Sequence, residues 1–124
     1  MKINILFKRI TELNYSISED LVNKNVNFEY ENTETKNNLS YLPSLENKNV
    51  VVKVKTSVVS KIEDAEFRRL NFEMDVLLEL DEFESGDDTE ELIKEVHGQY
   101  VPLHKILVEN ITKSITSLDN LPRL

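Results

Sequence analysis

The chain contains no cysteine, and only two of its 124 residues are glycine. The lack of cysteine excludes a disulfide framework, a thiolate metal site and a cysteine nucleophile. Phosphate-cradling loops, nucleophile elbows and dinucleotide fingerprints need glycine where the backbone comes close to a ligand. Gly86 and Gly98 stand apart from each other, so these nucleotide-binding and hydrolytic classes are disfavoured.

Long apolar runs and excess positive charge are also absent. No segment approaches the roughly 20 apolar residues that span a bilayer, and the start of the chain is interrupted by Asn4 before it resembles a secretory signal. The net charge is −8, with 23 acidic against 15 basic residues, which disfavours binding to a phosphate backbone. We therefore expect a cytoplasmic protein with no cofactor, no nucleic-acid partner and no membrane partner.

Alternating apolar and polar residues predict four β-strands in one domain that spans residues 1–124. The first, residues 3–17, loses its alternation near residues 8–10, which indicates a bulge or bend. The third and fourth strands are predicted to pair as a hairpin, because β-branched and apolar residues occupy alternate positions in both. The predicted strands are residues 3–17, 22–30, 49–60 and 70–80, with residues 61–66 as the hairpin turn.

The segment from Asn32 to Lys48 is polar and contains Pro43, so it is predicted to be a loop or a long crossover. After the strands, two helices are expected. Asp88 and Glu91 resemble a capping box at the start of a short helix that Gly98 ends. Pro102 then opens the last helix. Strands followed by helices indicate the α+β class with an antiparallel sheet.

No catalytic or metal-binding pattern stands out. His97 and His104 are the only histidines, and their spacing of seven residues does not match the i, i+4 arrangement of a two-histidine metal site. The acidic residues 82–91 lack the regular ligand spacing of a calcium loop. An enzyme would require the two histidines to converge with carboxylates in a pocket, and we expect none.

Aromatic and apolar residues on the first two strands and in the following segment are the remaining candidates for function. Two interpretations stay open: these side chains belong to the core, or some of them line a groove that accepts extended apolar segments of another polypeptide. The candidate client-binding residues are Phe7, Tyr15, Phe28, Tyr30, Tyr41 and Leu42.

Several segments, in this order, resemble the SecB family of export chaperones. The closing helix carries Glu109 and Ile111 at the positions of that family's E-x-I motif, and residues 121–124 resemble its F-P-x-L ending. The matching segments are I-T-E-L-N-Y-S-I at 10–17, N-V-N-F-E-Y at 25–30, N-V-V-V-K-V-K-T-S-V at 49–58, and residues 102–124.

The resemblance implies a SecB-like fold, with a four-stranded antiparallel sheet followed by two helices. It also implies assembly as a homodimer or homotetramer and binding of non-native polypeptides along apolar surface grooves. The chain departs from the family where acidic residues serve docking to the export motor SecA, because Asn14, Ser18 and Leu70 occupy those positions. These departures disfavour SecA-dependent export.

Two functional hypotheses follow from the residues and the resemblance together. The first is a SecB-like molecular chaperone that binds non-native or partner polypeptides through apolar surface. The second is a SecB-like adaptor or antitoxin-type regulator, which keeps the fold but binds one specific protein partner. A chaperone should suppress the aggregation of several unrelated proteins, whereas an adaptor should bind its one partner with fixed stoichiometry.

Overall fold

The computed structural model describes residues 2–19, 31–44, 46–81 and 89–118, and the account below concerns these residues. They form four strands and a helix, namely β1 (Lys2–Ile17), β2 (Glu31–Ser44), β3 (Asn49–Ile62), β4 (Ala65–Asp81) and α2 (Thr89–Thr116). All strand pairs are antiparallel, in the order β1-β4-β3-β2. The predicted α+β class and antiparallel sheet are therefore confirmed.

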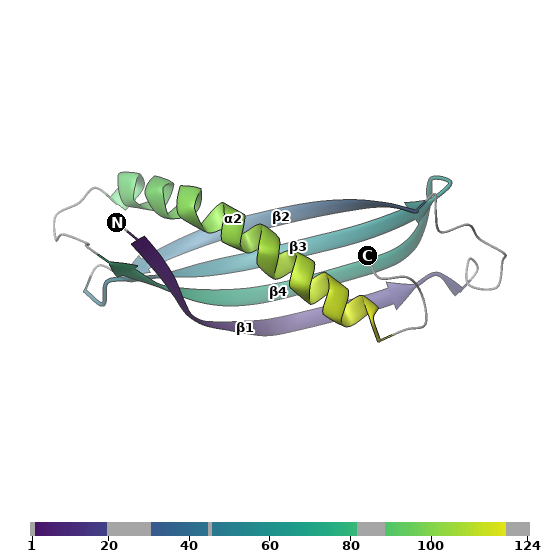
Figure 1. Ribbon diagram of the computed structural model, residues 1–124, viewed down its shortest axis with the longest axis horizontal. Coiled ribbons are helices and arrows are strands. Elements are labelled where there is room, and N and C mark those ends of the chain that lie inside the picture. The colour runs from purple at the N-terminus through teal and green to yellow at the C-terminus, as the bar shows by residue number, and fades with distance from the viewer. Residues whose placement is uncertain (1, 20–30, 45, 82–88, 119–124) are drawn as a thin grey trace.

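Helix α2 crosses one face of the sheet diagonally (Figure 1). We call this face the helix side. The other face, which no described element covers, we call the open side. This two-layer arrangement places the core between α2 and the two central strands.

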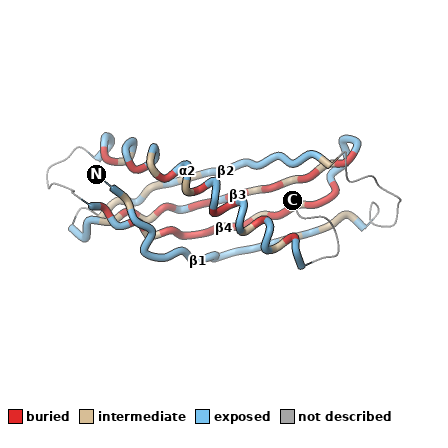
Figure 2. Tube along the Cα trace, in the orientation of Figure 1, coloured by how far each residue is buried: buried red, intermediate tan, exposed pale blue. Residues whose placement is uncertain are grey.

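The core is built from alternate residues of β3 and β4. Even-numbered residues of both strands point to the helix side and are buried, from Val50 to Val58 and from Leu70 to Leu80. Figure 2 shows this burial along the two central strands and along one side of α2. The helix contributes residues spaced four apart, and this spacing keeps them on one side of the helix. These helix residues are Leu92, Val96, Tyr100, His104, Val108, Thr112 and Thr116.

The predicted hairpin of the third and fourth strands is confirmed, with a tighter turn than expected. Strand β3 extends to Ile62, which pairs with Ala65, so only two residues form the turn. Glu63 and Asp64 have φ values of 53° and 65°. Two consecutive residues with positive φ are typical of a type I′ turn, whose twist matches the twist of the flanking strands.

Strand β1 confirms the predicted irregularity and shows that it occurs twice. The pairing with β4 shifts between Ile5 and Phe7 and again between Ile10 and Glu12. Each shift inserts one extra residue, which moves the following side chains to the opposite face. The apolar residues Ile3, Ile5, Ile10 and Leu13 consequently share the helix side, while Phe7 points to the open side.

The prediction of a loop over residues 32–48 is wrong, because most of this segment forms β2. Its main chain pairs with β3 from Glu31 opposite Ile62 to Ser44 opposite Asn49. An edge strand needs only one partner and exposes most of its side chains, so a polar sequence is compatible with it. Proline is tolerated in such a strand, which explains Pro43. The strand predicted for residues 22–30 lies outside the described residues.

The prediction of two separate helices is also wrong, because α2 runs without a break through both predicted segments. Gly98 and Pro102 lie inside it. A proline ring clashes with the carbonyl of the residue four positions earlier, and here that residue is Gly98. Nothing lies within 4 Å of a Cβ placed on Gly98, so crowding by neighbours does not explain the glycine. The buried stripe continues past both residues and holds the helix against the sheet.

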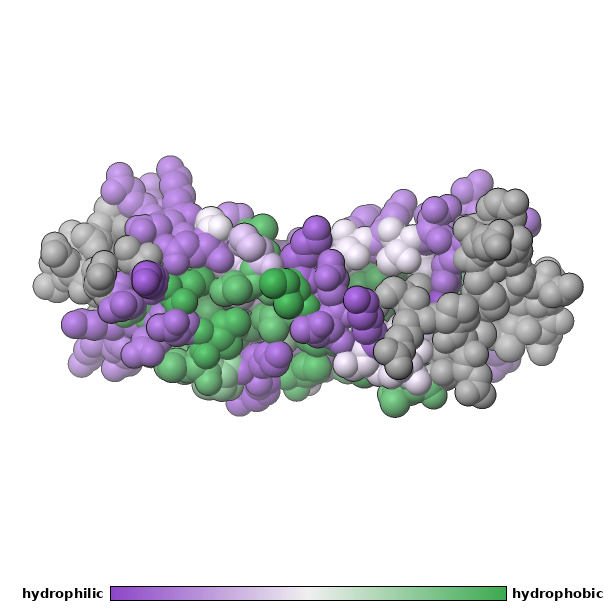
Figure 3. Space-filling model, in the orientation of Figure 1, coloured by the Kyte–Doolittle hydropathy of each residue, from purple (hydrophilic) through white to green (hydrophobic). Residues whose placement is uncertain are grey.

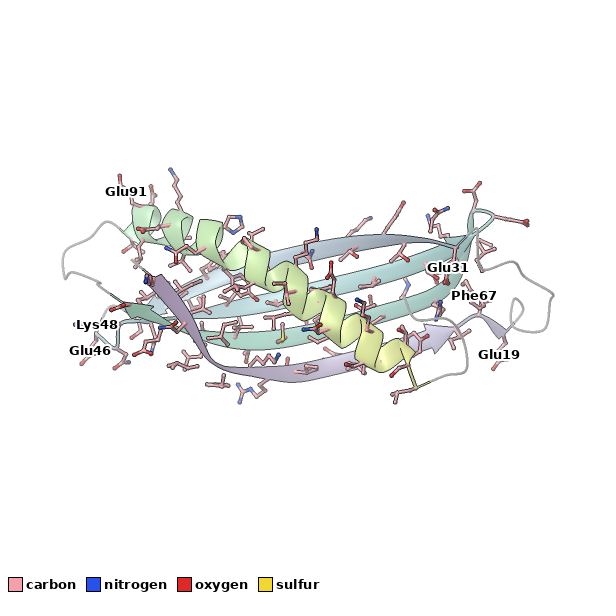
Figure 4. All side chains as sticks on the ribbon, in the orientation of Figure 1. Glu19, Glu31, Glu46, Lys48, Phe67 and Glu91 are labelled. Carbon is pink, nitrogen blue, oxygen red and sulfur yellow. The ribbon has the colours of Figure 1, made fainter. Side chains whose placement is uncertain are left out.

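A buried ion pair joins β2 to β4 at the end of the sheet that carries the β3–β4 turn. The Arg68 side chain is completely buried, and its Nε and Nη2 donate hydrogen bonds to the Glu31 carboxylate at 3.0 and 2.5 Å. The Ser60 hydroxyl donates a third bond to the same carboxylate at 2.7 Å. Glu31 and Phe67, the residue before Arg68, lie at this end in Figure 4. The pair fixes the start of β2 across β3.

We predict that Gly98→Ala stabilises the protein by about 0.5–1 kcal/mol, because alanine loses less backbone entropy in a helix interior and its Cβ meets open space. The free energy of unfolding, measured by chemical denaturation, checks this value. A loss of stability would show instead that Gly98 is needed to accommodate the Pro102 ring.

We predict that Glu31→Ala destabilises the protein by about 3–5 kcal/mol, because it leaves the Arg68 guanidinium buried without its counter-ion. Glu34→Ala, an exposed position on the same strand, is the matched control and should change the free energy of unfolding by less than about 0.5 kcal/mol. The double variant Glu31→Ala/Arg68→Leu should recover part of the loss. Equal free energies of unfolding for Glu31→Ala and Glu34→Ala would contradict the prediction.

Candidate polypeptide-binding surface

Four apolar side chains from all four strands form a continuous row on the open side. Residues that pair across antiparallel strands point to the same face with adjacent Cβ atoms. Phe7 and Leu42, at the ends of the row, have 49% and 55% of their surface exposed, and the two central residues are half-buried. We call this set the cross-strand row; in strand order it is Phe7, Leu77, Val51 and Leu42.

The next row of side chains on the open side is charged. Asp75, in its centre, accepts a hydrogen bond from Arg9 at 3.0 Å and lies 2.9 Å from the Lys53 ammonium. Hydrogen bonds from Lys53 and Arg9 hold the pKa of Asp75 below its ordinary value. Arg9 and Lys53 are both largely exposed and share this single carboxylate, so the row carries one excess positive charge.

A hollow of about 460 Å³ lies on the sheet further toward the end that carries the β3–β4 turn. Its lining includes Glu12 and Glu73, which lie directly opposite each other on β1 and β4. A hydrogen bond between the two carboxyl groups raises the pKa of Glu12, and Lys55 lies 3.3 Å from Glu73. The Ser57 and Asn71 side chains continue the lining. All of its lining residues except Phe72 are polar or charged, so the hollow is not a continuation of the apolar row.

The helix side has its own exposed apolar patch, between α2 and the N-terminal half of β1. Figure 3 shows hydrophobic side chains gathered there. Ile5, Ile10 and Leu13 of β1 are 36–44% exposed, and Ile106 of α2 is 54% exposed. The diagonal course of α2 leaves this part of the strand uncovered (Figure 1). Strand β1 therefore presents apolar side chains on both faces of the sheet.

A chain of hydrogen bonds under α2 gives His104 a structural role. His104 is buried, and its Nε2 donates to Asn37 Oδ1 at 2.8 Å, while its Nδ1 lies 3.2 Å from the Tyr100 hydroxyl. The Thr56 hydroxyl donates to the same Asn37 oxygen. An acceptor at Nδ1 and a donor at Nε2 describe a neutral imidazole. Burial lowers the pKa of His104, which favours this neutral form.

His97, nearer the start of α2, contacts the edge strand. The Tyr41 hydroxyl lies 2.5 Å from His97 Nδ1, and the two rings meet edge to face. Burial raises the pKa of Tyr41, so its hydroxyl stays protonated and can donate this bond. The two histidines thus fasten α2 to β2 at separate points and do not converge on a common site.

Within residues 2–19, 31–44, 46–81 and 89–118, no group of three or more histidine and acidic side chains could hold a metal ion. In the same residues, no helix has the length and apolar character needed to cross a membrane.

The structure separates the six candidate residues into three groups. Phe7 and Leu42 lie on the open side as the two ends of the cross-strand row. Tyr15 and Tyr41 lie on the helix side and pack, partly buried, against the core. Phe28 and Tyr30 lie outside the described residues. The four described candidates therefore lie on two opposite faces of the sheet.

Sequence reasoning missed the middle of the row. Val51 and Leu77 break the polar pattern on the solvent-facing positions of β3 and β4, and this is the signal that could have identified them. Their adjacency depends on the register between the strands, which places Val51 opposite Leu77.

Comparison with solved structures identifies a similar fold at low sequence identity. The *Mycobacterium tuberculosis* Rv1957 SecB-like chaperone, solved in complex with a ChAD peptide from the Rv1956 HigA1 antitoxin, superposes with a TM-score of 0.76 and 12% identity. The match covers 98% of this chain and 86% of that chain. This chain has a SecB-like fold. The strands and α2 described above are thus the SecB-like sheet and helix of this protein.

A protein of unknown function from *Streptococcus agalactiae* is also similar, with a TM-score of 0.44 and 16% identity over 100% of this chain and 95% of that chain. No protein-family model matches the sequence, and no curated protein matches it. The SecB-like fold consequently rests on the structural comparison.

We predict that acid destabilises the protein through His104. Its pKa is lowered in the folded state, whereas in the unfolded chain it returns to about 6.5. The unfolded state therefore binds more protons below about pH 6.5, so the contribution of His104 is complete above that pH and declines as the pH falls toward the folded pKa. Chemical denaturation between pH 7.5 and 5.5 should show this loss. His104→Gln should have a flatter profile, and an unchanged slope would contradict the assignment.

Proposed function

We propose that this protein is a SecB-like molecular chaperone that binds non-native or partner polypeptides through exposed apolar side chains. The observation that carries the proposal is the amount of apolar surface on β1. Ile5, Leu6, Phe7, Ile10 and Leu13 are all exposed on one edge strand of 16 residues. Contiguous apolar surface of this kind marks interaction sites, because a water-exposed patch gains free energy when another apolar surface covers it.

The magnitudes favour binding of an extended segment over a small ligand. Complete burial of one leucine, isoleucine or phenylalanine side chain contributes about 1.5–3 kcal/mol. Several such contacts are needed to exceed the cost of ordering an extended chain. Strand β1 supplies them over its length, with Phe7 on one face and Ile10 and Leu13 on the other. In this proposal Phe7 and Leu42 are direct contacts, and Tyr15 and Tyr41 border the surface from the core.

A second candidate is an adaptor or antitoxin-type regulator that binds one specific protein. It is supported by the similar *M. tuberculosis* SecB-like chaperone, which was solved with a peptide from an antitoxin. The network of buried polar contacts that orients α2 gives the surface a defined shape, which suits a single partner. The two candidates share the same binding surface and differ in the range of sequences that it accepts.

Assembly of the chain into a homodimer or homotetramer is part of the proposal. The outer edge of β1 pairs with no described strand, and edge strands with unpaired main-chain groups are templates for strand addition. Light scattering should give a mass of two or four chains, and a strict monomer would contradict the proposed assembly.

We propose binding without catalysis, in the cytoplasm and without a cofactor. The support for a non-enzymatic role is the use of both histidines, the only ones in the chain, as hydrogen-bond partners that hold α2 to β2. His97→Gln should therefore leave client binding unchanged, because it removes a ring from the β2 contact and touches neither apolar surface.

The main test is suppression of aggregation of several unrelated, heat-unfolded proteins. The variant Ile10→Ser/Leu13→Ser removes two exposed apolar side chains from β1, and we expect the amount of protein needed for half-suppression to rise by roughly tenfold or more. Lys8→Ser, at an exposed polar position on the helix side of the same strand, is the matched control and should resemble the parent chain.

Two outcomes of this experiment separate the candidates. Suppression across unrelated proteins supports the chaperone, whereas no suppression combined with tight, stoichiometric capture of one cellular protein supports the adaptor. Activity that is identical in Ile10→Ser/Leu13→Ser and the parent chain would contradict the role assigned to β1.

A further inference from the structure

The cross-strand row lies on a face whose other paired positions are polar or charged, apart from Val59. On one side it borders Asn4, Glu79, Asn49 and Ser44, and on the other it borders the Arg9, Asp75 and Lys53 row. Ladder positions further along the open side are held by polar and charged residues such as Glu12, Lys55 and Asn71. Four apolar residues in register across four strands thus form a narrow strip with a polar border on each side.

We propose that the cross-strand row, together with Arg9 and Lys53 beside it, binds a short apolar segment of a partner protein that carries an acidic residue next to its apolar stretch. The inference rests on the proposed function, and it adds the location and the chemistry of one class of bound segment. The site lies on the open side, on the opposite face of the sheet from the helix-side patch.

The dimensions of the row define the length of the segment. Neighbouring strands lie about 4.8 Å apart, so the three spacings from Phe7 to Leu42 add up to about 14 Å. An extended chain covers about 3.3–3.6 Å per residue, and four or five residues therefore span the row. Phe7 and Leu42, the most exposed members, would contact the two ends of this stretch.

Charge complementarity selects an acidic neighbour. Arg9 and Lys53 are exposed and share the single carboxylate of Asp75, which leaves one positive charge unbalanced beside the row. The other border of the row carries the Glu79 carboxylate, and the chain as a whole has a net charge of −8, so the attraction for a carboxylate is confined to the border with Arg9 and Lys53. A lysine at the same place in the segment would face Arg9 and Lys53 and be disfavoured.

The test uses two labelled synthetic heptapeptides, each with five apolar residues, followed by two aspartates in one and two lysines in the other. Anisotropy titration of the full chain at low salt should show the aspartate peptide binding about twofold to fivefold more tightly, the range that solvent-exposed ion pairs supply. The difference should largely disappear at about 1 M salt, where surface charges are screened. Equal affinities at low salt would overturn the charge assignment.

Variants locate the site. Phe7→Ser/Leu42→Ser should weaken both peptides by roughly tenfold or more, because it removes the two most exposed apolar contacts. Arg9→Gln should weaken only the aspartate peptide, and it leaves the Lys53–Asp75 pair intact. Leu118→Ser, at an exposed apolar position after α2 that belongs to neither apolar surface, is the control and should leave both affinities unchanged. Circular dichroism and the mass of each variant confirm that it is folded and assembled as the parent.

The outcomes distinguish this inference from the proposed function. Unchanged peptide affinity in folded Phe7→Ser/Leu42→Ser would overturn the row as the binding site, even if the protein still suppresses aggregation. A reduced oligomer mass of Phe7→Ser/Leu42→Ser would also overturn the row as the binding site, because it would show that a second copy of the chain covers the row. Peptide binding at the row without any aggregation suppression would support the site and contradict the chaperone.

Discussion

The structure depends on the packing of one stripe of α2 against the even-numbered side chains of β3 and β4. Residues such as Val96 and Tyr100 are fully buried in one cluster with strand residues such as Val52 and Val76. The two central strands are buried along most of their length in this way, whereas the edge strands contribute only partly buried residues such as Tyr15 and Tyr41. The edge strands are held mainly by their ladders, and their side chains are therefore available for other roles.

The two edge strands differ in chemistry, and the difference assigns their roles. Strand β2 is polar over most of its length and is fixed by specific contacts, the Glu31–Arg68 pair at one end and the Tyr41–His97 contact near the other. Strand β1 carries more apolar residues than β2, and its two bulges distribute them over both faces of the sheet. The bulges are thus responsible for the two separate apolar surfaces, because without them Phe7 would lie on the same face as Ile3 and Ile5.

The hairpin of β3 and β4 was predictable because the alternation of apolar and polar residues in both strands indicates one buried and one exposed face. Strand β2 was not, because a solvated edge strand needs no apolar pattern and main-chain pairing to β3 decides its conformation. The helix break expected at Gly98 and Pro102 does not occur, because buried residues before and after these positions pack one continuous helix against the sheet. The cross-strand row could not be read from any one strand, because its continuity depends on the register of Phe7, Leu77 and Val51.

The buried polar groups limit how far the binding surfaces can adapt. His104, Asn37 and Thr56 lock α2 at one angle over the sheet, and the Arg68–Glu31 pair fixes where β2 begins. Strong, satisfied polar contacts of this kind favour one arrangement of the core over its alternatives. Apolar patches on a rigid fold gain affinity from the burial of apolar surface alone and therefore accept many sequences. The adjacent cations Arg9 and Lys53 instead favour a segment that carries an acidic residue. In the proposed function, a protein with both features would hold diverse segments weakly at β1 and prefer a particular acidic segment at the row, so the two candidate roles would use the same arrangement of surfaces.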